Sequence, residues 1–237
     1  MRILLVSGHT GGYNKCATTG VNEGDLNIEL VENIKGILDK YAEVEVYPHE
    51  RDMYKDLKAG VVLLDLRAFD YIFEVHFNGS DGRGRGTSIF LHTDYNGGVS
   101  VEHGILMNME ALGFKLRGEG GFNRKNTLLN MNTAFYAGVD YALIETCFYD
   151  NVEDMDRYKV NKHAVAVAIA DGIIQGFGLH RNDAVVEPVT PEVEAPKENE
   201  EKVLYRVQVG AFSNRDRAEA VLQMLKDLGI DGYIKKG

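Results

Sequence analysis

The sequence of 237 residues has little cysteine and proline, and it has no long apolar run. Its two cysteines, Cys16 and Cys147, cannot build a disulfide framework, so we interpret both as free thiols. No segment approaches the roughly 20 consecutive apolar residues of a transmembrane helix, so we expect no membrane partner. The start, Met1-Arg2-Ile3, lacks the basic and apolar pattern of a secretory signal peptide. We therefore expect synthesis in the cytoplasm and release by some other route.

Positive charge is also scarce. The chain has 26 Lys and Arg against 36 Asp and Glu, which gives a net charge of −10. Residues 1–182 hold 18 basic and 25 acidic side chains, net −7, and residues 183–202 hold 2 and 7, net −5. An acidic body disfavours nucleic acid as the main partner, because phosphate backbones are bound by clustered Lys and Arg.

The prolines divide the chain into three segments. Three of the four lie within residues 183–202, among Glu, Val and Ala, a composition that cannot bury a core. We therefore predict a domain at residues 1–182, an acidic Pro-rich linker at 183–202 and a small module at 203–237. The pattern of the module predicts a strand, a helix and a strand. Such a β-α-β unit is too small to be stable as an isolated domain.

Within residues 1–182, apolar runs alternate with amphipathic helical patterns. The predicted strands are 3–7, 44–47, 71–76, 87–92 and 141–146. The predicted helices start near 22–25 and run to 41, then span 53–68, 100–112, 127–137 and 161–177, whereas 113–126 is expected to be irregular. Alternating strands and helices predict an α/β fold, with a mainly parallel or mixed sheet covered by helices on both faces.

Four polar side chains follow strand ends or helix starts. His9 and His76 come at the ends of two predicted strands, Glu23 starts a helix, and Glu145 ends a third strand. In open α/β sheets, ligands bind at the carboxyl ends of the strands. Two imidazoles and one carboxylate suit Zn²⁺ with an open fourth position. Glu145 would then be the further carboxylate that moves protons, with its pKa raised by burial.

Simpler interpretations remain open at this point. Glu23 could be a first-turn acid favoured by the helix dipole, and His76 a core histidine. We interpret Glu74 as a sheet-face residue. Cys147 could be a nucleophile, but no histidine is evidently paired with it.

Four motifs in order resemble the zinc-dependent N-acetylmuramoyl-L-alanine amidases of the amidase-3 type. They are Ser7-Gly8-His9-Thr10-Gly11-Gly12, Asn22-Glu23-Gly24-Asp25-Leu26-Asn27, Val75-His76-Phe77-Asn78 and Ile144-Glu145-Thr146-Cys147-Phe148. The resemblance implies that His9, Glu23 and His76 bind zinc and that Glu145 is the catalytic carboxylate. It also implies hydrolysis of the amide between N-acetylmuramic acid and L-alanine in peptidoglycan. The residues next to the implied ligands differ from the usual family pattern. For example, this chain has His76-Phe77-Asn78 where the family often has His-Ala-Asn.

A second resemblance concerns the C-terminal module. Residues 204–236, especially Tyr205-Arg206-Val207-Gln208-Val209-Gly210-Ala211-Phe212, resemble one half of a sporulation-related repeat (SPOR) domain, a peptidoglycan-binding module. Because a whole module has two halves, we expect a homodimer through residues 203–237. The combination of an amidase domain and a wall-binding module is similar to that of phage endolysins, which are released through a holin or by cell lysis. It is also similar to that of sporulation or autolytic amidases. We favour the endolysin.

Three other functions fit parts of the sequence. A zinc peptidase acting on stem peptides pairs the same ligand types with a catalytic Glu, but the family motifs disfavour it. A wall-binding protein without catalysis is disfavoured because Glu145 accompanies all three ligands. A nucleotide-binding domain is weaker, because residues 8–12 lack the glycine spacing of a dinucleotide loop. We assign no substrate-contacting residue, and give no role to His92 or His103.

Overall fold

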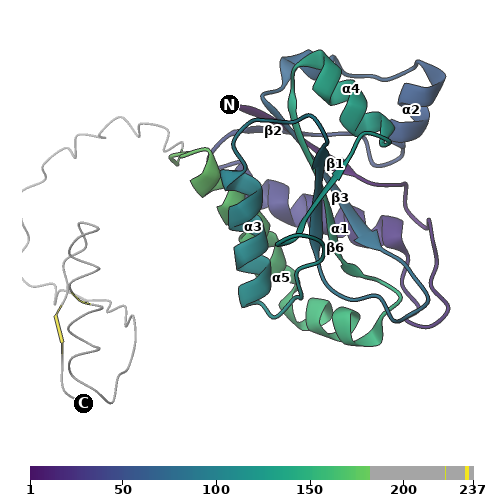
Figure 1. Ribbon diagram of the computed structural model, residues 1–237, viewed down its shortest axis with the longest axis vertical. Helices are drawn as coiled ribbons and strands as arrows, with labels where there is room; N and C mark the ends of the chain where they lie inside the picture. Colours follow the sequence, from purple (N-terminus) through teal and green to yellow (C-terminus); the bar gives the residue numbers. More distant parts are fainter. Residues whose placement is uncertain (182–221, 223–232, 235–237) are drawn as a thin grey trace, which may run out of the picture. The chain divides into compact units, whose positions relative to one another are not determined.

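The computed structural model describes residues 1–181, 222 and 233–234 (Figure 1). The expectations for the linker at 183–202 and for nearly all of 203–237 lie outside the described residues. Among the described residues, no helix is long and apolar enough to cross a bilayer.

The core of the fold is one mixed sheet of six strands. The strands lie in the order β2-β1-β3-β6-β4-β5. All neighbouring pairs are parallel except β4 and β6, which are antiparallel. Their bounds are β1 (Arg2–Ser7), β2 (Glu43–Val46), β3 (Tyr71–Asn78), β4 (Ser88–His92), β5 (Phe122–Lys125) and β6 (Asp140–Phe148). The predicted mainly parallel or mixed sheet is confirmed.

Helices cover both faces of this sheet, as predicted. One face packs against α1 (Glu23–Leu38), α3 (Ser100–Ala111) and α5 (Val152–Gly176). The other face packs against α2 (Met53–Ala59), the short 3-10 helix η1 (Leu66–Ala68) and α4 (Leu129–Ala137). Figure 1 shows α3 beside α5, and α2 beside α4 at the opposite side of the sheet. Because successive strand residues point to opposite faces, the four central strands β1, β3, β6 and β4 supply side chains to both apolar cores.

Three predicted elements differ from the structure. The helix predicted at 53–68 ends at Ala59, because Gly60 adopts a left-handed conformation with φ of 69° and caps α2. The segment predicted to be irregular contains β5, which pairs with β4 at the sheet edge. The last helix starts at Val152 rather than 161, and only Asn161 within it has non-helical backbone angles.

Candidate metal centre

Three parallel strands bring the residues of the predicted site together at the carboxyl end of the sheet. β1, β3 and β6 are neighbours, so their carboxyl ends meet there. His9 follows β1, while His76 and Glu145 lie directly opposite each other on β3 and β6. The register between β3 and β6 shifts just after this pair, between His76 and Asn78. Such irregularities are common beside active sites, where they re-aim side chains.

Strand alternation puts the polar groups on one face. Ile72 of β3 belongs to the core under α2 and α4, so Glu74 and His76, two and four residues later, share its face. Gly8 makes room for the imidazole, because a Cβ atom at Gly8 would lie 2.0 Å from Cε1 of His76. The glycine is therefore required by packing rather than by turn geometry alone.

His9 is held in an unusual backbone conformation. Its φ is 71°, in the left-handed region that non-glycine residues rarely adopt. Its ring stacks on Tyr13 with a centroid distance of 4.0 Å, and its Nδ1 lies 3.7 Å from the carboxylate of Asp52. Burial and the nearby His76 lower the pKa of His9, which favours the neutral imidazole that metals bind. Strain of this kind is typical of functional sites.

Glu23 is the first residue of α1 and points into the cluster. Its Oε1 lies 3.1 Å from Nδ1 of His76 and 3.6 Å from Nε2 of His9, while Asn14 donates to its Oε2 at 2.8 Å. Burial alone would raise the pKa of Glu23, but the hydrogen bonds from His76 and Asn14 lower it. The carboxylate is therefore ionised at neutral pH, as a metal ligand must be.

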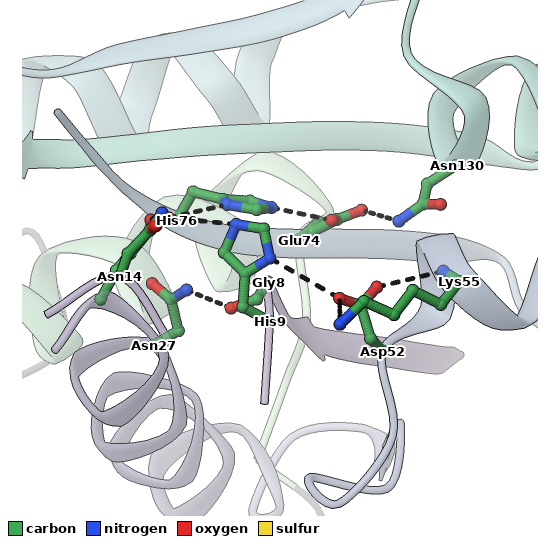
Figure 2. A network of polar contacts seen from close by, with 10 residues as sticks. Gly8, His9, Asn14, Asn27, Asp52, Lys55, Glu74, His76 and Asn130 are labelled. Carbon is green, nitrogen blue, oxygen red and sulfur yellow. Dashed lines mark hydrogen bonds and ion pairs between the residues drawn. The ribbon is translucent and has the colours of Figure 1, made fainter. Parts of the chain in front are cut away.

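These three residues fit a divalent metal ion. One ligand atom from each of His9, Glu23 and His76 lies within 4.8 Å of the others. Ligands about 2.0–2.2 Å from a tetrahedral Zn²⁺ are roughly 3.3–3.5 Å apart, so only small shifts would close this cluster around an ion. The rings of His9 and His76 meet edge to face, with their centroids 5.0 Å apart (Figure 2). The structure therefore places the three sequence-predicted ligands together.

Glu145 faces the cluster without joining it. Its Oε2 is buried and has no hydrogen-bond partner among the described residues. Burial raises its pKa to about 7, while the attraction of His76 partly opposes that shift. A carboxyl group that titrates near neutral pH is suited to accept a proton and to pass it on.

Glu145→Gln should stabilise the metal-free protein at alkaline pH. An unfolded glutamate loses its proton near 4.5, whereas Glu145 in the native state keeps it until about 7. The stability of the native state therefore falls as the pH rises through this window, and a neutral glutamine avoids that loss. We expect a gain of about 3 kcal/mol at pH 8 and less than about 1 kcal/mol near pH 5, measured by urea unfolding with a chelator present. An equal gain at both pH values would show a steric cause instead.

The cluster opens into a cavity of about 440 Å³. Its walls combine the ligand residues with apolar side chains from β4, α4 and the chain before it, including Phe90, Leu128 and Leu129. Lys125, from the end of β5, is the only Lys or Arg among the described lining residues. A cavity of this size can admit an extended peptide or sugar segment beside the metal centre.

The remaining candidates lie elsewhere. Cys147 is fully buried on the opposite sheet face, and burial raises its pKa well above the ordinary value, so it is no accessible nucleophile. His92 is buried and stacks on Phe135, and His103 is exposed on α3. Two contacts of the site were not predicted: Asp52 lies beside His9, and Glu74 contacts His76.

Two family models match parts of this chain. Residues 3–175 match the family model described as N-acetylmuramoyl-L-alanine amidase, and residues 186–236 match the SPOR domain model. The SPOR match starts inside the segment predicted to be a linker.

Two curated relatives cover nearly the whole chain. The N-acetylmuramoyl-L-alanine amidase CwlM of Bacillus licheniformis is 24% identical over 99% of this chain and 84% of its own length. The sporulation-specific N-acetylmuramoyl-L-alanine amidase of Bacillus subtilis is 22% identical with the same coverage.

Solved structures share the fold of residues 1–181. The amidase Ami1 of Mycobacterium smegmatis has a TM-score of 0.61 at 18% identity, over 75% of this chain and 97% of its own. The catalytic domain of an endolysin targeting Clostridia difficile has a TM-score of 0.59 at 24% identity. The match covers 74% of this chain and 97% of the endolysin domain. Since the family model spans well over half of the sequence, the chain belongs to the N-acetylmuramoyl-L-alanine amidase family, enzymes that cleave the amide between N-acetylmuramic acid and L-alanine in peptidoglycan.

Proposed function

We propose that this chain cleaves the muramoyl–alanine amide as a zinc hydrolase, with His9, Glu23 and His76 as zinc ligands and Glu145 as the catalytic carboxylate. The observation that carries the proposal is the convergence of the three ligand atoms within 4.8 Å, with the buried carboxyl group of Glu145 beside them. Two nitrogen ligands and one oxygen ligand leave a fourth position for water or substrate, as in hydrolytic zinc sites.

The chain's own residues supply positioning and proton transfer. When bound, Zn²⁺ would polarise the amide carbonyl and make water acidic at neutral pH. Glu145 takes the proton from the attacking water and gives it to the nitrogen of L-alanine as the amide breaks. A pKa of about 7 lets one carboxyl group act first as base and then as acid near neutral pH. The apolar walls from α4 and β4 hold the substrate and limit bulk water.

Product analysis of digested peptidoglycan tests this proposal. Mass spectrometry should detect stem peptides with a free α-amine on L-alanine, together with glycan strands whose muramic acid is intact. A zinc peptidase, the alternative reaction, would instead shorten stem peptides that stay attached to the glycan. Shortened stems as the sole products would refute the amidase and support the peptidase.

We also propose that the enzyme acts as an endolysin. Its fold likeness to an endolysin catalytic domain supports this setting. The sporulation-specific relative in Bacillus subtilis, which matches across the tail as well, supports a sporulation amidase as the second setting. Co-expression with a holin in a susceptible host separates them, because an endolysin should lyse growing cells within minutes of holin opening.

A last proposal concerns the tail, which the described residues do not cover. The SPOR match at residues 186–236 supports wall binding by this segment, and we propose that two copies of the tail pair in a homodimer. Analytical ultracentrifugation should then give a dimer for the full chain and a monomer for residues 1–182. The truncated chain should still cleave soluble fragments but act more weakly on intact walls. A monomeric full chain with unchanged wall binding after truncation would refute this proposal.

A further inference from the structure

Glu74 occupies a position that the proposed reaction does not use. It lies in the middle of β3, two residues before His76, and only 4% of it is exposed. Its Oε1 lies 2.9 Å from Nε2 of His76, the ring nitrogen on the side away from Glu23 (Figure 2). Among the described residues, no Lys or Arg forms an ion pair with Glu74. A buried carboxylate without such a partner is costly, so its contact with the imidazole calls for a functional explanation.

We propose that Glu74 is a positioning residue that accepts the Nε2–H proton of His76 and thereby directs Nδ1 toward the metal. This inference rests on the proposed metal centre at His9, Glu23 and His76.

The two nitrogens of His76 have different neighbours. Nδ1 lies 3.1 Å from Oε1 of Glu23, inside the ligand cluster, whereas Nε2 lies 2.9 Å from Oε1 of Glu74. An ionised carboxylate only accepts hydrogen bonds, so the nitrogen facing Glu74 must carry a proton. A neutral imidazole has one protonated nitrogen, which leaves the Nδ1 lone pair free for the metal. A carboxylate on the far nitrogen also makes the imidazole a stronger ligand.

Hydrogen bonds to its second carboxylate oxygen fix the orientation of Glu74. Its Oε2 accepts hydrogen bonds from Nδ2 of Asn130, at 2.8 Å, and from the hydroxyl group of Tyr141. These donors come from α4 and β6, so the carboxylate is held by two elements besides its own strand. With both oxygens engaged, Glu74 cannot rotate toward the cluster, which agrees with a positioning role rather than a ligand role.

The variant Glu74→Gln isolates this role. Glutamine keeps the size of the side chain but has one acceptor and one donor in place of two acceptors. Asn130 and Tyr141 both donate, so they favour the amide oxygen on their side and leave the NH₂ group facing Nε2 of His76. The imidazole would then have to accept at Nε2 and carry its proton on Nδ1, where the metal must bind.

Glu102→Gln is a matched control. Glu102 is also buried, at 3% exposure, and accepts a hydrogen bond from a tyrosine of β3, at 2.9 Å from the hydroxyl group of Tyr71. It contacts the opposite end of that strand and lies outside the ligand cluster. A general effect of removing a buried carboxylate should therefore appear in both variants.

The experiment measures zinc affinity of the full-length chain by competition with a chromophoric chelator. We expect Glu74→Gln to bind Zn²⁺ about 10–100-fold more weakly than wild type, and Glu102→Gln to bind within about twofold of wild type. Equal affinity of wild type and Glu74→Gln would overturn this inference while leaving the proposed function intact. Failure of the wild-type chain itself to bind zinc would instead refute the proposed function.

A second measurement needs no variant. In the zinc-loaded wild-type chain, ¹⁵N-resolved NMR of the histidine rings should show His76 protonated at Nε2 and coordinated through Nδ1. This result would stand even if Glu74→Gln failed to fold. Coordination through Nε2 would overturn the inference, because Glu74 would then face the metal rather than a ring proton.

Discussion

His9→Ala and His76→Ala should each lose the bound zinc and reduce peptidoglycan cleavage to the level of a buffer control. Each variant removes one of the three proposed protein ligands, and two ligands rarely retain zinc against competing buffer and chelator. Zinc content by mass spectrometry and wall lysis by turbidity provide the two measurements. A chelator should have the same effect on the wild type, and added Zn²⁺ should restore its activity.

His163→Ala is the matched control, because His163 is exposed on α5 and outside the ligand cluster. It should keep both zinc and activity. One zinc per chain in the doubly substituted His9→Ala, His76→Ala protein would place the metal elsewhere.

Zinc binding should also weaken as the pH falls. Burial alone would lower the pKa of His76, but its hydrogen bonds with Glu23 and Glu74 raise it well above the ordinary value in the metal-free protein. His76 is therefore protonated at neutral pH before the metal arrives, and binding must release a proton. Titration calorimetry in buffers of different ionisation enthalpy measures this release, which we expect to be about one proton per zinc at pH 7.

Glu145→Ala should keep the fold and the zinc but lose most turnover. This variant removes the carboxyl group that is proposed to take the proton from water and deliver it to the leaving nitrogen. Loss of a general base typically costs about 10²–10⁴-fold in rate. The rate is measured on a soluble muramoyl-peptide, and zinc content on the same sample.

Glu153→Ala serves as the control, because Glu153 is an exposed glutamate near the start of α5, with 56% of its side chain accessible. It should cleave at the wild-type rate. Near-normal turnover by a folded, zinc-loaded Glu145→Ala protein would remove Glu145 from the mechanism.

Much of the site could be predicted from strand ends alone. The apolar runs before His9 and His76, and the run ending at Glu145, fix three neighbouring parallel strands whose carboxyl ends must meet. Glu23 could be predicted from its position at the start of a helix that follows the first strand. The contact of Glu74 with His76 was also within reach, because residues two apart on a strand point to the same face.

Other features depend on tertiary context. The φ of 71° at His9 cannot be read from the sequence, because histidine itself does not favour that conformation. Asp52 lies far from His9 in the chain and reaches it only because α2 packs beside the site. β5 was not predicted because Phe122–Lys125 is short, mostly polar and directly preceded by glycines. The end of α2 at Gly60 was missed because the apolar pattern continues beyond it.

Anomalous X-ray scattering at the zinc edge, from crystals of the full-length wild-type chain grown with Zn²⁺, tests the central claim most directly. The account predicts one strong peak per chain, within about 2.0–2.2 Å of a ring nitrogen of His9, a carboxylate oxygen of Glu23 and Nδ1 of His76. A peak bound by other residues, or no peak among these three in a protein that still cleaves the muramoyl–alanine amide, would contradict it.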